Sequence, residues 1–267
     1  MDSLQHQGAG GIPPGLAGPS PACLEAHLRT LYALSQYSPH VFASPLGPFQ
    51  VGDRHAYVPR FMFFGPRACD DSWRLSFLAG FDHRDLRASQ ALLALAGRLA
   101  EDAEAGHGLN LSFFPLVDAA GLFLGAPDRA LASAHWGRSG LPEIELLELD
   151  ARRRAYHGFV RVETAPPGSS EIEIRVRGAV KDPEFPDLDL ITSDETDGLP
   201  VQFSQEGCAL PLDGPLSAAE DLPFRPFELT ILVPSGWPGE AYRRAVTTVL
   251  TRFLARYRAF QAYGQHL

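Results

Sequence analysis

Apolar segments of strand length alternate with segments of helical periodicity along this chain, and this alternation constrains its fold more than any other feature. The expected strands span residues 73–80, 109–117, 158–163, 171–177 and 227–233. The expected helices span residues 24–37, 89–103, 142–156 and 240–263. Alternating strands and helices favour an α/β fold, here a single domain with a mostly buried mixed or parallel β-sheet flanked by helices.

The rest of the chain divides into a tail, one further strand and long loops. Residues 1–20 are rich in glycine, proline and polar residues and are expected to form a disordered tail, leaving a single domain over 21–267. An apolar run over 55–64 predicts a strand, with Pro59 indicating an edge or a bulge. Residues 181–222 are rich in proline, aspartate and glycine and are expected to form long loops.

Charge and cysteine content argue against several classes of partner. A formal net charge of −9 is unfavourable for binding nucleic acid. The three cysteines are widely separated and form no CxxC pair, which fits a reducing cytoplasm. No signal-peptide pattern and no apolar run of about 20 residues is present, so neither secretion nor a membrane span is expected. We therefore expect a cytoplasmic protein without nucleic-acid or membrane partners.

The segment Gly80-Phe81-Asp82-His83-Arg84-Asp85 follows an expected strand and contains several chemically active side chains. In α/β proteins the carboxyl ends of the strands are the usual place for ligand-binding and catalytic groups. The segment is therefore a candidate site. The alternative is a solvated loop in which Asp85 caps the following helix.

Four segments, in this order, resemble the zinc carboxypeptidase superfamily. They are the Gly80–Asp85 segment, Pro115–Gly121 (PLVDAAG) with His135–Arg138 after it, the strand at 158–163, and Thr230–Pro234 (TILVP). The chain looks most like the compact aspartoacylase and succinylglutamate-desuccinylase-like branch, and the resemblance covers about residues 55–260. It implies a zinc-carboxypeptidase-like α/β fold and, for the family, metal-dependent hydrolysis of amide bonds.

The family's metal site maps onto residues of other types in this chain. The Gly-x-His-x-x-Glu motif places its zinc histidine on Asp82 and its zinc glutamate on Asp85. The third ligand, a histidine that ends a strand, falls on Glu163, or on Val162 if the alignment slips by one residue. The general-base glutamate of the T-x-E-x-P strand falls on Leu232.

These substitutions oppose the family's chemistry. Three carboxylates without an imidazole are a poor zinc site and suit calcium or magnesium better. Leucine cannot accept a proton from water. The interpretation is a pseudoenzyme without a cofactor. The alternatives are a hard divalent cation held by the carboxylates, a working metallo-carboxypeptidase or amidohydrolase with relocated ligands such as His83, His135 or His157, and a coincidental resemblance.

Two arginines remain at positions where family members hold a substrate carboxylate or an oxyanion. Arg84 precedes the second ligand position, and Arg138 is what remains of the family's D-L-N-R motif. The resemblance implies a carboxylate-bearing partner, a peptide or an acyl-amino acid, bound through the guanidinium fork. The other interpretation is that these arginines neutralise the carboxylates at the former zinc positions.

Overall fold

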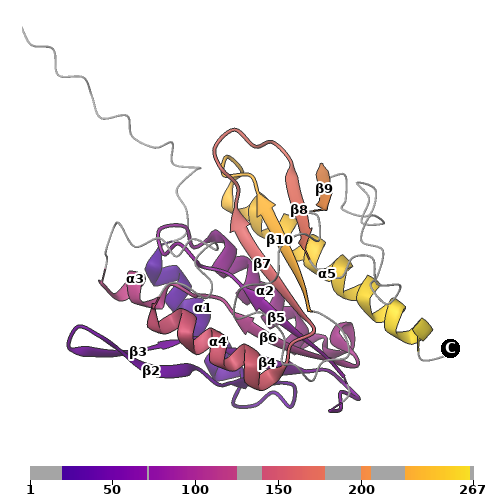
Figure 1. Ribbon diagram of the computed structural model, residues 1–267, viewed down its shortest axis with the longest axis horizontal. Helices are drawn as coiled ribbons and strands as arrows, with labels where there is room; N and C mark the ends of the chain where they lie inside the picture. Colours follow the sequence, from indigo (N-terminus) through magenta and orange to yellow (C-terminus); the bar gives the residue numbers. More distant parts are fainter. Residues whose placement is uncertain (1–19, 71, 125–139, 178–199, 206–225, 265–267) are drawn as a thin grey trace, which may run out of the picture.

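A computed structural model describes residues 20–70, 72–124, 140–177, 200–205 and 226–264 (Figure 1). The helices are α1 (Pro21–Leu34), α2 (Arg87–Glu101), α3 (Ala119–Leu124), α4 (Pro142–Arg154) and α5 (Gly239–Gly264), with a 3-10 turn at Ala103–Gly106. The strands are β1 (Val41–Ala43), β2 (Leu46–Val51), β3 (Arg54–Val58), β4 (Phe61–Phe64), β5 (Trp73–Leu78), β6 (Leu109–Phe114), β7 (Gly158–Thr164), β8 (Ile172–Arg177), β9 (Val201–Gln205) and β10 (Phe227–Val233).

The main sheet is mixed, with a parallel centre. Its eight strands lie in the order β1-β4-β6-β5-β7-β10-β8-β9. Strands β6, β5, β7 and β10 are parallel neighbours, whereas β4 and β8 run antiparallel to the strands beside them at the centre. Because β5, β7 and β10 are adjacent and parallel, their carboxyl ends meet at one edge of the sheet.

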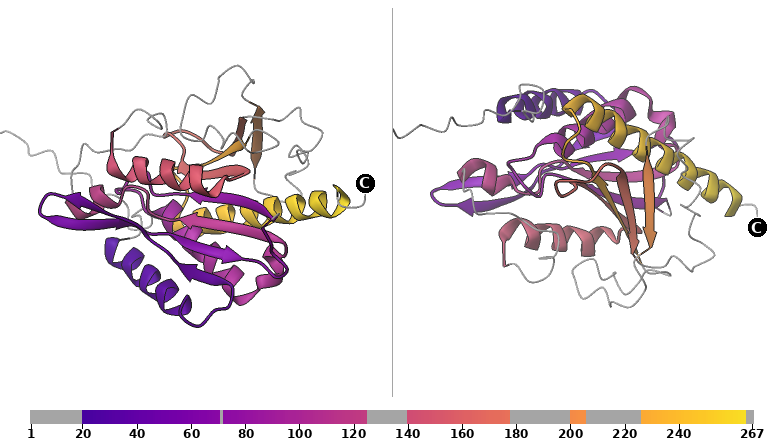
Figure 2. Two further views of the ribbon diagram at one scale, coloured as in Figure 1. Left: turned by 60° about the horizontal axis from the view of Figure 1, so that its bottom comes forward. Right: turned by 90° about the horizontal axis from the view of Figure 1, so that it is seen from above.

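Helices cover both faces of this sheet. Figure 2 shows α1, α2 and α5 on one face and α4 on the other. On the first face, α5 buries an apolar stripe that includes Val246, Leu250 and Phe253. On the second, α4 buries Ile144 and Leu147. Burial on both faces explains why the central strands are almost continuously apolar.

Helix α4 carries the charge distribution that stabilises a helix. Pro142 occupies the first helical turn together with Glu143, and three arginines, Arg152 to Arg154, form the last turn. Acidic groups at the amino end and basic groups at the carboxyl end both oppose the helix dipole. Ala155 then ends the helix in the left-handed conformation, with φ of 49°.

The predicted α/β fold with one mixed sheet is confirmed, and the strand at 227–233 is found with its predicted bounds.

Two predictions need correction. The expected strand at 55–64 is two strands in different sheets, because Pro59 and Arg60 separate β3, which pairs with β2, from β4 of the main sheet. The expected loop at 181–222 contains β9. Apart from Pro200 and β9, the residues of this segment lie outside the described part of the chain. The expected tail also lies outside it, over residues 1–19. Strands β1 and β2 were not predicted.

No helix in the described part of the chain combines the length and the apolar character needed to cross a bilayer.

Candidate functional site at the carboxyl ends of the central strands

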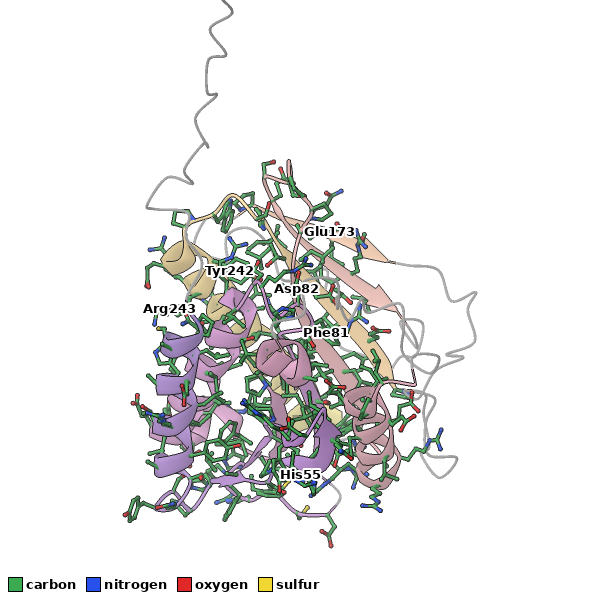
Figure 3. All side chains as sticks on the ribbon, turned by 90° about the vertical axis from the view of Figure 1, so that its left-hand side faces the viewer. His55, Phe81, Asp82, Glu173, Tyr242 and Arg243 are labelled. Atoms are coloured by element: carbon green, nitrogen blue, oxygen red, sulfur yellow. The ribbon has the colours of Figure 1, made fainter. Side chains whose placement is uncertain are left out.

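The loop after β5 brings the predicted site residues to the carboxyl edge of the sheet. Gly80 starts this loop with φ of +69°, and a Cβ there would lie 2.8 Å from the carbonyl oxygen of Pro115. Only glycine fits this close approach without a shift of the backbone. In Figure 3, Phe81 and Asp82 of the loop and Tyr242 of α5 lie toward one end of the molecule, with His55 at the other.

Asp85 is held at this edge by three hydrogen bonds from two side chains. Its carboxylate accepts hydrogen bonds from Arg87 Nε and Nη2 at 2.9 and 2.6 Å and from the Thr164 hydroxyl at 2.7 Å. Burial alone would raise the pKa of Asp85, but the bonds from Arg87 and Thr164 outweigh it and hold this pKa below its usual value. Asp85 also accepts the backbone N–H of Arg87, the first residue of α2, although the N-cap position itself is Leu86.

Arg87 joins this carboxylate to the segment that follows β10. It donates to the carbonyl oxygens of Ser235 and Trp237 at 2.8 and 3.3 Å, and its guanidinium lies over the ring of Tyr242, 5.1 Å from the centroid. The hydroxyl of Tyr242 lies 3.1 Å from that of Thr164. We call Asp85, Arg87, Thr164 and Tyr242 the Asp85 cluster. It links the loop after β5 to β7, to α5 and to the end of β10.

Asp82 forms a separate and more exposed pair. Arg84 Nε and Nη2 each bond one oxygen of its carboxylate at 2.8 Å, which is a bidentate arrangement. These hydrogen bonds lower the pKa of Asp82. The side chains of Arg84 and Asp82 are 54% and 39% exposed, so solvent weakens the attraction between them.

Glu163 and Leu232 lie side by side on adjacent strands. They are partners in the parallel register of β7 and β10. The carboxylate of Glu163 lies 3.2 Å from Arg161, and Arg161 also binds Glu228 at 2.9 Å. Burial raises the pKa of Glu163, although Arg161 acts in the opposite direction. Leu232 is buried and has no ionisable group.

His83 is paired with a carboxylate from a distant part of the sequence. Its Nδ1 lies 2.6 Å from Asp118, whose side chain is completely buried, and the His83 side chain is 9% exposed. The other oxygen of Asp118 accepts the backbone N–H of Gly121 in the first turn of α3. A Cβ on Gly121 would lie 2.2 Å from Asp118 and 2.4 Å from His83 Nδ1, so a glycine is needed beside this pair.

These contacts do not fit a zinc ion of the family type. Each carboxylate that the resemblance maps onto a ligand position faces an arginine two residues away. Successive side chains of a strand leave opposite faces of the sheet, so Thr164, which holds Asp85, and Glu163 start from opposite faces. Among the described residues, no group of three or more His, Cys, Asp or Glu side chains is arranged to hold a metal ion.

The remaining predicted residues lie elsewhere or outside the described part. Arg138 and His135 fall within 125–139, which the structure does not describe. His157 precedes β7 at its amino end and accepts the backbone N–H of Arg74, so it is remote from Glu163 along the strand. Burial lowers the pKa of His157 to about 4, and the charge of Arg74 acts in the same direction.

Arg87, Thr164 and Tyr242 were not predicted. The spacing of the charges could have found Arg87, because Asp82 with Arg84 and Asp85 with Arg87 repeat the same Asp-x-Arg pattern. Nothing local in the sequence indicates Thr164 or Tyr242. Thr164 lies 79 positions from Asp85, which it binds, and Tyr242 lies 78 positions from Thr164, which it contacts.

Comparisons with known proteins agree with this geometry at the level of the fold. No protein-family model matches the chain, and no curated protein matches it either. Solved structures, in contrast, do match it. A putative metallopeptidase from Shewanella baltica OS155 is 17% identical with a TM-score of 0.60, covering 88% of this chain and 91% of that chain. A putative carboxypeptidase A from Shewanella denitrificans OS-217 is 16% identical with a TM-score of 0.65, covering 90% and 70%.

A third similar structure has a bound compound. It is a metallo-carboxypeptidase from Pseudomonas aeruginosa in complex with (2-guanidinoethylmercapto)succinic acid, 13% identical with a TM-score of 0.58, and it covers 91% of this chain and 70% of that chain. At such low identities the likeness concerns the fold and not the activity. The predicted fold is confirmed: this chain has the zinc-carboxypeptidase-like fold shared by these metallopeptidases and metallo-carboxypeptidases.

Proposed function

We propose that this chain is a non-catalytic member of the zinc carboxypeptidase superfamily that acts as a binding protein. Within the superfamily we assign it to the compact aspartoacylase and succinylglutamate-desuccinylase-like branch. We place it in the cytoplasm, where the exposed cysteines Cys23 and Cys69, neither of which is in a disulfide, would stay reduced.

One observation carries the proposal. The carboxylates at the three former ligand positions face arginines, and the general-base position is a buried leucine beside Glu163. A zinc site for hydrolysis needs ligands that converge and leave one coordination position open for water. A guanidinium beside each carboxylate supplies the positive charge that a metal would otherwise supply, and leucine takes no proton.

For the ligand we propose a carboxylate-bearing peptide or acyl-amino acid. Arg84 and Arg138 are the arginines that the family resemblance assigns to such a ligand. Arg84 already donates two side-chain hydrogen bonds to Asp82. A ligand carboxylate would therefore have to displace Asp82 or be bound mainly by Arg138. We therefore assign the larger share of ligand binding to Arg138.

A second candidate function, metal-dependent hydrolysis with relocated ligands, has one observation in its favour. A histidine that binds a metal through one ring nitrogen commonly donates from the other to a carboxylate. The pair of His83 Nδ1 with buried Asp118 has this form. Hydrolysis would then need further ligands from outside the described residues, with His135 the nearest candidate in the sequence.

Metal content separates the two candidates. We expect protein purified without chelators to contain far less than one zinc, calcium or magnesium ion per chain by elemental analysis. We also expect no hydrolysis of acyl-amino acids or C-terminal peptide bonds above the buffer rate when zinc is added. One zinc per chain, lost in His83→Ala together with hydrolysis, would refute the proposal and establish the alternative.

Ligand binding is tested separately. We expect N-acyl-amino acids to raise the melting temperature of the wild-type protein and to do so much less in Arg138→Ala. Arg29→Ala is a matched control, because Arg29 is 77% exposed on α1 and pairs with Glu25 of the same helix. No effect of any acyl-amino acid or short peptide on the wild type would rule out this ligand class.

A further inference from the structure

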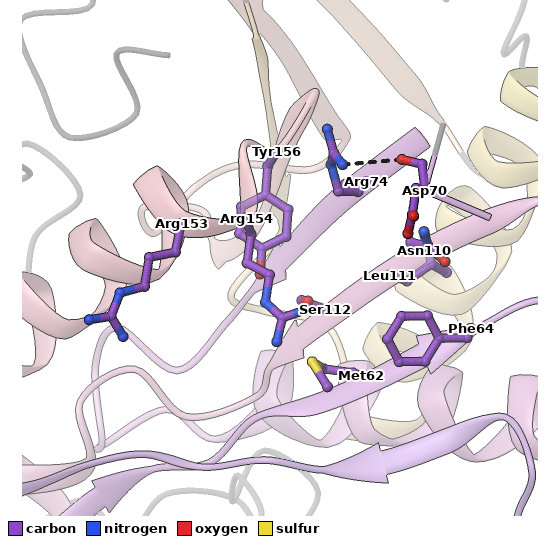
Figure 4. A pocket seen from close by; sticks show the side chains of 10 residues that line it. All are labelled: Met62, Phe64, Asp70, Arg74, Asn110, Leu111, Ser112, Arg153, Arg154 and Tyr156. Atoms are coloured by element: carbon purple, nitrogen blue, oxygen red, sulfur yellow. Dashed lines mark hydrogen bonds between the residues drawn. The ribbon is translucent and has the colours of Figure 1, made fainter. Parts of the chain in front are cut away.

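A pocket lies at the end of the central strands that is opposite the candidate site. It is bounded by the amino-terminal parts of β5 and β6, by β4 and by the last turn of α4, and its volume is about 220 Å³ (Figure 4). The candidate site described above lies at the carboxyl ends of β5 and β7. This pocket is therefore separated from that site by the length of the sheet.

Among the described residues, three arginines line the pocket, against one carboxylate, that of Asp70. The arginines are Arg74 of β5 and Arg153 and Arg154 of α4. Arg74 is half-buried and donates to the carbonyl oxygens of Asp70 and Ala155 at 3.3 and 3.2 Å. Within the described part of the chain, Arg74 and Arg153 have no carboxylate at ion-pair distance. The chain as a whole carries −9, so this basic pocket is a local exception.

Arg154 has only a weak internal partner. Its Nε lies 3.9 Å from Asp150, beyond hydrogen-bond distance. Asp150 is already bound by Arg60 and by the hydroxyl of Tyr156, the latter at 2.7 Å. Figure 4 shows the Arg154 side chain extending toward Ser112 and Met62, across the pocket. Its guanidinium can therefore take a further anionic partner.

The rest of the described lining is mixed. Met62 and Phe64 of β4 supply apolar surface, and Asn110 and Ser112 of β6, which pair with them in register, supply polar groups on the same face of the sheet. A cavity of about 150 Å³ suffices to bind benzene. A pocket of about 220 Å³ therefore accommodates a ring or a short aliphatic group together with an anionic head group.

We propose that this pocket binds a small organic oxyanion, a carboxylate or a phosphate monoester. The anionic head binds Arg74 and Arg154, with Arg153 at the rim, and the apolar part packs on Met62 and Phe64. Guanidinium groups pair with both head groups through parallel N–H donors. The proposal is independent of the ligand proposed for the candidate site, because the two sites share no residue.

Titration calorimetry at low ionic strength with benzoate and phenyl phosphate tests this inference. Benzamide, the neutral counterpart of benzoate, should bind at least about tenfold more weakly because it lacks the charge. Arg154→Gln should weaken binding of both anions by about tenfold or more. Arg152→Gln is the matched control: it removes the same charge from the same turn, but Arg152 does not line the pocket. It should leave the affinity within about twofold.

A second variant tests the pocket without changing its charge. Met62→Trp fills the space beside Phe64 and should abolish binding while the circular dichroism spectrum and melting temperature stay close to wild type. This variant decides the question if Arg154→Gln proves unfolded. The inference is overturned if neither anion binds at millimolar concentration, if Arg152→Gln weakens binding as much as Arg154→Gln, or if Met62→Trp binds like the wild type. Binding of one anion alone supports it and identifies the head group.

Discussion

At the scale of single residues, one short spacing governs the charges at the candidate site. Among the described residues, a carboxylate and an arginine two positions apart form an ion pair four times: Asp82 with Arg84, Asp85 with Arg87, Glu163 with Arg161, and Glu173 with Arg175. The last two pairs lie in strands, where residues two apart share a face of the sheet, and the first two lie in and just after the loop that follows β5. The positive charges beside these carboxylates are thus supplied locally by the sequence.

The Asp85 cluster allows a prediction about stability and pH. Arg87→Met removes the guanidinium from a carboxylate that is 25% exposed and should lower the free energy of unfolding by about 1.5–3 kcal/mol at pH 7. The folded-state pKa of Asp85 lies below the ordinary 3.8, so its contribution is present above that pH and is lost as pH falls through the folded value. Urea unfolding from neutral to acid pH measures this.

The difference between wild type and Arg87→Met should therefore shrink in acid. Arg84→Met is the control, because its partner Asp82 is more exposed and the pair should contribute less than about 1 kcal/mol. Equal losses in the two variants, or a loss in Arg87→Met that does not change with pH, would contradict the role given to Arg87.

At the candidate site, the sequence could indicate only what is local: the Gly80–Asp85 segment was expected to follow a strand, and it follows β5. The register that sets Glu163 beside Leu232 depends on the pairing of β7 with β10, which local sequence does not show. The partner of His83 could not be predicted, because Asp118 lies 35 positions away and is brought close only by folding of the loops after β5 and β6. The Thr164 and Tyr242 contacts have the same origin.

At the scale of elements, a buried ion pair fixes α4 to the segment before β4. Arg60 binds Asp150 of α4, and both side chains are 7% exposed. Arg60 also donates to the carbonyl oxygen of Ser44 at 2.7 Å, and Asp150 accepts from Tyr156. Pro59 and Arg60 thus have two effects: they divide the apolar run into β3 and β4, and they place a guanidinium under α4.

Breaking this pair from one side should be costly. Arg60→Met leaves Asp150 as a buried, unneutralised carboxylate and should lower the free energy of unfolding by about 3–5 kcal/mol. Adding Asp150→Asn removes the remaining charge and keeps an acceptor for Tyr156, so the double variant should recover at least half of that loss. Chemical denaturation of the wild type, both single variants and the double variant measures the coupling. No recovery in the double variant would show that Arg60 acts by packing alone.

Elements were predictable where hydrophobic pattern and length agreed. Strand β10 is an uninterrupted buried run, and α5 presents an apolar stripe at helical spacing, so both were found close to their true bounds. Strand β1 has three residues, and β2 contains Gly47 and Pro48, so neither shows a strand pattern. Strand β9 lies at the sheet edge beside β8; its five residues alternate apolar and polar, but this short pattern was missed within a segment rich in proline, aspartate and glycine.

At the scale of the whole molecule, this chain shares its fold with metallo-carboxypeptidase structures, while no group of its described residues is arranged to hold a metal ion. The parallel strands β5, β7 and β10 still bring their carboxyl ends to one edge. There the Asp85 cluster connects the loop after β5 to β7 and to the segment after β10. A scaffold can keep its topology through its buried core while its site residues change independently.

This view predicts the outcome of restoring the family's residues. The variant carries Asp82→His, Asp85→Glu, Glu163→His and Leu232→Glu. We expect it to be less stable than wild type and to gain no zinc-dependent rise in melting temperature. The longer Glu at 85 displaces the bonds to Arg87 and Thr164, and position 232 is a buried place that a carboxylate occupies only at a cost.

Thermal unfolding with added zinc and with a chelator gives the answer, and the same variant with Leu232→Gln in place of Leu232→Glu serves as the control for the added charge. The opposite outcome would be a chelator-reversible rise in melting temperature with zinc, together with hydrolysis of an acyl-amino acid. Such a result would mean that four side chains alone separate this protein from catalysis. The Asp85 cluster argues otherwise, because it fixes the loop after β5 in a position that a converging set of ligands would have to change.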